Sequence, residues 1–202
     1  LLVGVAKVPV RVLQRSLKKQ GVTVYTGSRL EGVERVGEEM VARITRKGKE
    51  VVVTADKVLV TVGRRPSLRG LGLENLGLDA GGAFLPVNEK MQTAVPHIYA
   101  AGDITWAPLL AHRASAQAEV AVEVIAGHSR TYHPRAMPMV CYSTPEIATV
   151  GLSAAQAAEQ GIDPPVGQFL LAASGRALAA GRTDGFVRFV ARGDDDRVVG
   201  VQ

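Results

Sequence analysis

An apolar segment that stops on a glycine and an aspartate constrains the fold of this chain more than any other feature. The segment begins at Thr93, passes through the apolar residues 98–101 and ends on Gly102-Asp103. In α/β folds, a strand that ends this way places a carboxylate at the carboxyl edge of a sheet, where ligands bind. Gly102 lets a ligand approach the backbone, and the Asp103 carboxylate accepts hydrogen bonds from sugar-like hydroxyls. The pattern predicts a ligand site, although an aspartate after a strand also serves as a helix or turn cap.

The sequence before this segment predicts one helix and several strands. Residues 10–20 place apolar side chains on one face of a helix that stops at Gly21. Residues 22–25 favour a short strand, and residues 30–36, 40–46 and 50–54 favour an antiparallel meander of three strands. The continuous apolar run at residues 58–62 favours a strand that is covered on both faces.

The sequence after it predicts a different mixture. Pro108 and Gly127 bracket an alanine-rich stretch that is typical of a helix from about Leu109 to Ala126. Ser153 and Gln156 have the spacing of a capping box, and residues 186–190 and 197–201 indicate a hairpin. Because this last strand is still running at Gln202, we expect the chain to be a segment of a longer protein.

Composition narrows the choice of partners. The net charge of +5 and the pI near 9.6 are compatible with a nucleic-acid-binding groove. The basic residues are dispersed, however, and only 4% of residues are aromatic, so a solvated basic surface is favoured over such a groove. No apolar run reaches the ~20 residues that a bilayer requires. The single cysteine, Cys141, excludes an internal disulfide. We therefore expect a cytoplasmic protein with neither a nucleic-acid nor a membrane partner.

Several motifs occur together in the order and spacing of one family. They are Val58–Pro66, Thr93–Asp103, Leu109–His112, Tyr142–Glu146, Val150–Ser153 and Ala172–Ala177. Over essentially all 202 residues the chain resembles the dihydrolipoamide dehydrogenases, a branch of the flavin-dependent pyridine nucleotide–disulfide oxidoreductases.

This resemblance implies a fold and an assembly. The expected fold class is α/β, with partial FAD- and NAD(P)-binding Rossmann-like domains and the start of an α+β interface domain. By this likeness residues 1–68 are the later part of the NAD-binding domain, residues 69–132 return to the FAD-binding domain, and residues 133–202 begin the dimerisation domain. The resemblance also implies a homodimer whose partners are dihydrolipoamide and the lipoyl domains of an acyltransferase component.

The resemblance carries cofactor roles onto individual residues. Asp103 corresponds to the aspartate that binds the ribityl chain of FAD, and Gly63 to a glycine whose backbone approaches the nicotinamide nucleotide. Leu30 aligns with an apolar position beside the adenine of NAD, although core packing explains it nearly as well. The amino end of the helix, at Leu109, Leu110, Ala111 and His112, corresponds to the segment that contacts the flavin in the resembled family. A plain buried helix would also use those two leucines.

The implied activity is the oxidation of dihydrolipoamide and the reduction of NAD⁺ through a redox disulfide and FAD, within 2-oxo acid dehydrogenase complexes. The chain contains no Gly-x-Gly-x-x-Gly loop, no cysteine pair and no counterpart of the family's His–Glu base. We therefore assign no catalytic or metal-binding residue and expect the isolated chain to be inactive. Two alternatives remain. The first is another disulfide reductase, of the mercuric or glutathione reductase type, although the motif Leu110-Ala111-His112 argues against it. The second is a non-catalytic module that binds nucleotides and dimerises.

Overall fold

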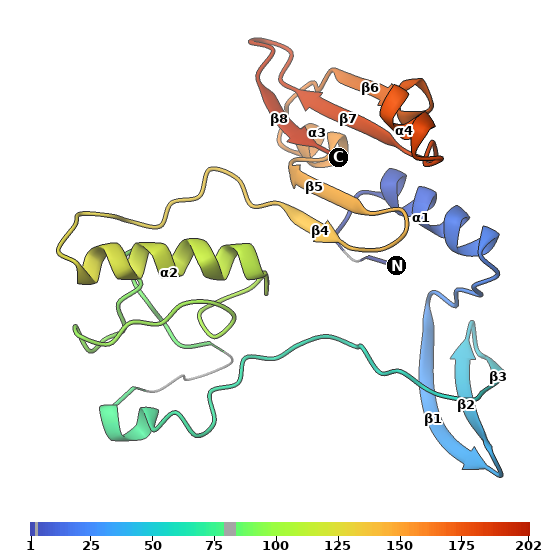
Figure 1. The fold of residues 1–202 in the computed structure, drawn as a ribbon, viewed down its shortest axis with the longest axis horizontal. Coiled ribbons are helices and arrows are strands. Elements are labelled where there is room, and N and C mark those ends of the chain that lie inside the picture. Colours follow the sequence, from blue (N-terminus) through green and yellow to red (C-terminus); the bar gives the residue numbers. More distant parts are fainter. Residues whose placement is uncertain (3, 79–83) are drawn as a thin grey trace. The chain divides into compact units, whose positions relative to one another are not determined.

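The computed structural model describes residues 1–2, 4–78 and 84–202, and these fall into two compact units (Figure 1). One unit combines Leu1–Val60 with Pro138–Gln202, and the other is formed by Thr61–Met137. The first unit is therefore built from two stretches of the chain that are far apart in sequence.

Helix α1 (Lys7–Lys19) confirms the predicted amphipathic helix but begins three residues earlier. Pro9 is tolerated there because the N–H groups of the first turn have no intrahelical partner. Val10 and Leu13 are buried, while the two lysines of the last turn lie where the helix dipole favours positive charge. The helix is thus tied to the first unit by one apolar face.

The predicted meander is confirmed as a three-stranded antiparallel sheet in the order β1-β2-β3. Its strands are β1 (Ser28–Val36), β2 (Glu39–Arg46) and β3 (Lys49–Ala55). The register of β1 against β2 shifts between Leu30 and Gly32, which indicates a bulge there.

The second sheet of this unit has five antiparallel strands in the order β4-β5-β8-β7-β6. The predicted hairpin is confirmed by β7 and β8, and the Ser153 capping box begins α3 as expected. In chain order the elements are β4 (Met139–Cys141), β5 (Ile147–Gly151), α3 (Ala154–Glu159), β6 (Val166–Leu170), the 3₁₀ turn η2 (Leu171–Ala173), α4 (Gly175–Ala179), β7 (Phe186–Ala191) and β8 (Val198–Val201).

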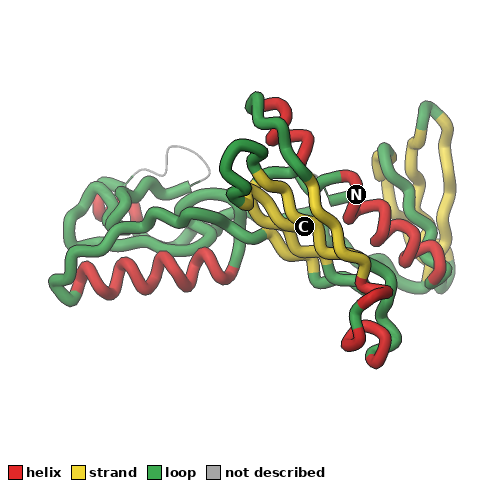
Figure 2. The backbone as a smooth tube through the Cα atoms, turned by 90° about the horizontal axis from the view of Figure 1, so that it is seen from above, coloured by secondary structure: helices red, strands yellow, loops and turns green. Residues whose placement is uncertain are grey.

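The second unit is organised around α2 (Ala111–Ile125), which confirms the alanine-rich helix. Figures 1 and 2 show this helix lying along the loop segments that precede it. Met91, Val120 and Ala121 form one buried apolar cluster between helix and loop, and Leu78, Leu85 and Ala100 form another. A single 3₁₀ turn, η1 (Leu73–Leu76), completes the described regular structure of this unit.

Three predicted strands are wrong in this structure. Residues 22–25 and 58–62 belong to no strand, and residues 98–101 contribute only an isolated bridge between Tyr99 and Gln92. The run 58–62 is exposed rather than covered on both faces, with Leu59 86% exposed. A strand needs a neighbour to satisfy its backbone. Among the described residues, segments 22–25 and 58–62 have no paired strand, and residues 98–101 have only the bridge to Gln92.

Candidate functional site

The turn before Gly102 is held by Thr93. Its hydroxyl accepts a hydrogen bond from the Val95 N–H at 3.1 Å and donates to the Ile98 carbonyl oxygen at 3.1 Å. Thr93 is buried, and its own N–H donates to the same Ile98 carbonyl at 2.9 Å. This turn reverses the chain, and the Ala100 N–H then bonds to the Met91 carbonyl at 3.0 Å. The backbone that leads into Gly102 is thereby fixed.

Gly102 sits in a backbone conformation that favours glycine, and it lies against the first turns of α2. Its φ is +86°, and a Cβ added there would stand 3.3 Å from the Ala114 Cβ. Its carbonyl oxygen accepts from the Thr105 N–H at 3.0 Å and from the Thr105 hydroxyl at 2.7 Å. The structure therefore brings the predicted Gly-Asp motif and the amino end of α2 together.

Gln117 makes the matching contact from the helix. Its Oε1 accepts a hydrogen bond from the Gly102 N–H at 2.7 Å, and its Nε2 donates to Thr105 Oγ1 at 3.2 Å. Gln117 is fully buried. Both backbone groups of Gly102 are thus satisfied, which fixes the peptide that precedes Asp103.

Arg113 is the unusual member of this cluster, because a buried guanidinium normally has a carboxylate partner. It is 1% exposed, donates from Nη2 to the Gly102 carbonyl at 3.1 Å and stacks over Trp106 at 5.2 Å. Its Nε and Nη1 have no hydrogen-bond partner among the described residues. Burial raises the pKa of nearby Tyr132, and the positive charge of Arg113 opposes that rise. A positive charge thus lies directly beneath the Gly-Asp motif.

Asp103 itself is half-buried, and its carboxylate has no hydrogen-bond or ion-pair partner among the residues that the structure describes. Helix α2 begins after Leu110, which provides no side-chain cap, and no acidic residue stands in the first turn. The first turn of α2 therefore presents the positive end of the helix dipole to an anion or a polar ligand. Leu109 is half-buried like Leu110, whereas Ala111 and His112 are exposed.

Gly63 and Leu30, the two residues assigned to NAD, are not members of the Gly102–Asp103 cluster. Gly63 has a φ of +132° in an exposed extended segment, and a Cβ there would meet nothing within 4 Å. Leu30 belongs to β1 of the other unit and is 53% exposed, so core packing does not account for it in this structure. Both assignments stay predictions.

Sequence reasoning missed the buried polar network beneath Gly102. Neither Arg113 nor Gln117 is assigned a role from the sequence. Their spacing of four residues, continued by Val120 and Ala121, is the signal that places them on the inward face of α2.

Among the described residues there is no group of three or more His, Cys, Asp and Glu side chains able to hold a metal ion. No helix in the described part of the chain has the length and apolar character needed to span a bilayer.

Two family models match this chain. Residues 8–118 match pyridine nucleotide-disulphide oxidoreductases, and residues 137–202 match the dimerisation domain of these oxidoreductases.

Curated relatives agree with these matches. The chain is 40% identical over 203 residues to dihydrolipoyl dehydrogenase of Geobacillus stearothermophilus, an alignment that covers all of this chain and 43% of the relative. It is 42% identical over 188 residues to dihydrolipoyl dehydrogenase of Pseudomonas aeruginosa, which covers 93% of this chain and 40% of the relative. The chain thus spans about two fifths of the length of these relatives.

Solved structures support the fold. LpdA from Mycobacterium tuberculosis superposes with a TM-score of 0.82 at 28% identity, covering 95% of this chain and 41% of that one. The Cu(II) complex of the flavoprotein disulfide reductase RclA from Escherichia coli gives a TM-score of 0.88 at 21% identity, covering 99% and 46%, and supports the fold alone. The expected fold class is confirmed, and the chain belongs to the pyridine nucleotide-disulphide oxidoreductase family.

Proposed function

We propose that this chain is a segment of an FAD-dependent dihydrolipoyl dehydrogenase, which oxidises dihydrolipoamide and reduces NAD⁺ through a redox disulfide. The observation that carries the proposal is the Gly102–Asp103 motif held by α2, in a chain that is about 40% identical to dihydrolipoyl dehydrogenases. The reaction as a whole needs groups that the proposal assigns to other parts of the dimer.

The residues present fit a flavin nucleotide on three observations. The Asp103 carboxylate has no partner among the described residues, the first turn of α2 has no side-chain cap, and a Cβ added to Gly102 would crowd the Ala114 Cβ at 3.3 Å. In this proposal Asp103 accepts hydrogen bonds from the ribityl hydroxyls. The N–H groups near Ala111 and His112 stabilise negative charge on the pyrimidine side of the ring system. When bound, FAD supplies a carrier that takes two electrons from thiols and passes them to a nicotinamide.

The remaining parts of the proposal follow the family match. Residues 137–202 match the dimerisation domain, which supports a homodimer. We assign the NAD contact to Gly63 and Leu30, the partner to the lipoyl domains of an acyltransferase component, and the location to the cytoplasm. The domain limits at residues 68 and 132 are likewise proposals.

Asp103→Ala in the full-length gene product tests the flavin site. The variant loses the acceptor of at least one charge-assisted hydrogen bond, so we expect FAD affinity to fall about tenfold or more. The measurement is the flavin absorbance retained per polypeptide after dialysis. Asp56→Ala is the matched control, because Asp56 is exposed and belongs to no predicted site. Unchanged flavin content in Asp103→Ala would remove the assigned role of Asp103.

The substrate is tested separately on the same protein. We expect dihydrolipoamide to drive NAD⁺ reduction, with no turnover of glutathione disulfide or mercuric ion by reduced nicotinamide nucleotides. Turnover of either of the latter substrates in place of dihydrolipoamide would favour the other disulfide reductases. A flavin-free protein without any of these activities would favour the non-catalytic module.

A further inference from the structure

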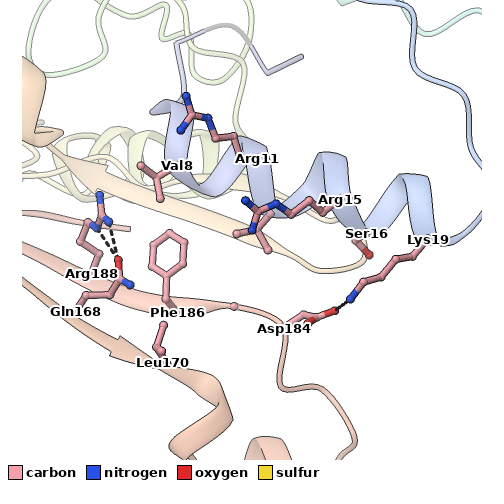
Figure 3. A pocket seen from close by; sticks show the side chains of 12 residues that line it. Val8, Arg11, Arg15, Ser16, Lys19, Gln168, Leu170, Asp184, Phe186 and Arg188 are labelled. Carbon is pink, nitrogen blue, oxygen red and sulfur yellow. Dashed lines mark hydrogen bonds and ion pairs between the residues drawn. The ribbon is translucent and has the colours of Figure 1, made fainter.

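A cationic cavity lies in the first unit, between α1 and the strands β6 and β7. It has a volume of about 430 Å³ (Figure 3). It lies on elements other than those of the Gly102–Asp103 cluster, which belongs to the second unit. Its lining residues are Val8, Arg11, Val12, Arg15, Ser16 and Lys19 from α1, and Gln168, Leu170, Asp184, Gly185, Phe186 and Arg188 from the strands and the turn before β7.

The helical wall of the cavity carries three like charges on one face. Arg11, Arg15 and Lys19 are spaced four residues apart, a spacing at which like charges on a helix repel each other. Lys19 is paired with Asp184 at 2.8 Å, and Asp184 is the one carboxylate among the described lining residues. Arg11 and Arg15 have no carboxylate partner in the described chain. The wall therefore has positive charge that the protein does not neutralise.

The opposite wall holds a guanidinium in a fixed position. Arg188 donates from Nε and Nη2 to Gln168 Oε1 at 3.0 and 2.6 Å, and it stacks over the Phe186 ring at 5.4 Å. Its partner is a neutral amide, so its charge remains available, while its orientation is already set. Figure 3 shows the Phe186 ring pointing from β7 toward Val8 of α1, beside this guanidinium.

The chemistry of the two walls describes one kind of ligand. Guanidinium groups bind phosphate by charge-assisted hydrogen bonds, and an aromatic ring flanked by aliphatic side chains accepts a flat apolar group. We propose that this cavity binds a small organic phosphate, with the phosphate between Arg15 and Arg188 and the apolar part against Phe186. The site is independent of the proposed flavin function, because it shares no residue with it.

Phenyl phosphate is the probe, because it joins a phosphate to an aromatic ring. We expect saturable binding of one molecule per chain to the full-length protein by isothermal calorimetry, with chemical-shift changes at the Phe186 and Arg188 amides. Inorganic phosphate lacks the ring and is expected to bind about tenfold more weakly, a loss on the scale of one buried apolar group. Phenol lacks the charge and is expected to give no saturation.

Variants separate this site from general attraction to a basic chain. Arg15→Gln and Arg188→Gln are each expected to weaken phenyl phosphate about tenfold, the loss of one charge-assisted hydrogen bond. Lys18→Gln makes the same change of charge on α1 at a residue outside the cavity lining and is expected to leave the affinity unchanged. Circular dichroism melts check that each variant is folded, and Arg15→Lys, which keeps the charge, is expected to bind with intermediate affinity.

Three results would overturn the proposal. The first is the absence of saturable phenyl phosphate binding. The second is an affinity for phenyl phosphate in Arg15→Gln and Arg188→Gln that equals that of the unchanged chain. The third is a loss of affinity in Lys18→Gln as large as in those two variants. Flavin content is expected to be unaffected by all of these variants, so the outcome is separate from the test of Asp103.

Discussion

Arg113 donates a hydrogen bond from Nη2 to the carbonyl oxygen of Gly102, and Gln117, one helical turn later, accepts one from the N–H of the same glycine. The two side chains contact the same residue from one face of α2, but they are not equivalent. The Gly102 carbonyl has a second partner in Thr105, whereas its N–H depends on Gln117. This difference decides which substitution is costly.

Gln117→Leu is expected to destabilise the protein. It leaves the buried Gly102 N–H without an acceptor, which costs about 1–3 kcal/mol of unfolding free energy. Urea unfolding at neutral pH measures the change. Glu119→Leu, at an exposed position of the same helix, is the control and should stay within about 0.5 kcal/mol of the unchanged protein. A loss in Glu119→Leu equal to that in Gln117→Leu would show that leucine in α2 is itself harmful.

Arg113→Met is expected to cost less than Gln117→Leu. The Gly102 carbonyl keeps both bonds from Thr105, and the substitution removes a buried charge that has two unpartnered nitrogens. Replacing such a charge with an apolar side chain is often neutral or favourable, so we expect a change below about 1.5 kcal/mol. The same urea series ranks the two variants, and the reverse order would contradict this account of the cluster.

Tyr132 gives the protein a pH dependence at the alkaline end. Burial favours its neutral phenol, so its pKa in the folded state is raised above that in the unfolded chain. The associated stability is complete below about pH 10 and is lost as the pH rises through the folded-state pKa. Tyr132→Phe should remove this loss because it leaves no hydroxyl to ionise. The buried hydroxyl has no hydrogen-bond partner among the residues that the structure describes, so none is lost. Thermal melts between neutral and alkaline pH measure it, with the exposed Tyr142→Phe as control.

Asp195 gives a second pH dependence, at the acid end and in the β7–β8 turn. Hydrogen bonding to Arg192 lowers the pKa of Asp195 to about 2. Because the folded-state pKa is depressed, the stabilisation is present above about pH 4 and is lost as the pH falls toward 2. Asp195→Asn should flatten this part of the melting curve against pH. Asp196→Asn, next in the same turn, should leave it unchanged, and identical curves for Asp195→Asn and the unchanged protein would contradict the prediction.

Gly200 of β8 lies opposite Gly151 of β5. A Cβ on Gly200 would overlap the Leu152 carbonyl oxygen, and one on its partner Gly151 would overlap the Val199 carbonyl oxygen. The strands must therefore separate in Gly200→Ala, at a cost on the order of 3 kcal/mol or more. Gly167→Ala is the matched control, because that strand glycine has nothing within 4 Å of its added Cβ, and it should change stability by about 0.5 kcal/mol or less. Thermal unfolding compares the two, and equal melting temperatures would contradict the contact.

The elements that sequence reasoning predicted correctly are those whose stability is local. The amphipathic face of α1, the three-strand meander and the Ser153 capping box each depend on residues within a few positions of one another. The strands expected at 22–25 and 58–62 depend on distant neighbours, and β-propensity alone does not supply them. Their sequence pattern shows what the backbone prefers and not whether a partner strand lies beside it.

The candidate site was predictable to the same degree. Asp103 and the amino end of α2 are recognisable from the apolar segment that stops on Gly-Asp and from Pro108 before the helix. Arg113 and Gln117 were not assigned, because a charged and a polar residue on a helix are expected to face solvent. Their burial follows from where Gly102 lies, which is a tertiary fact.

The exposed run at residues 58–62 has a consequence for the handling of this protein. Leu59 is 86% exposed and Val62 is 94% exposed, in an extended segment that pairs with no strand in the described part of the chain. Such a segment is a template for pairing with the same segment of another molecule. We therefore expect these five residues, which contribute to neither apolar cluster of the second unit, to promote association of the isolated chain at high concentration.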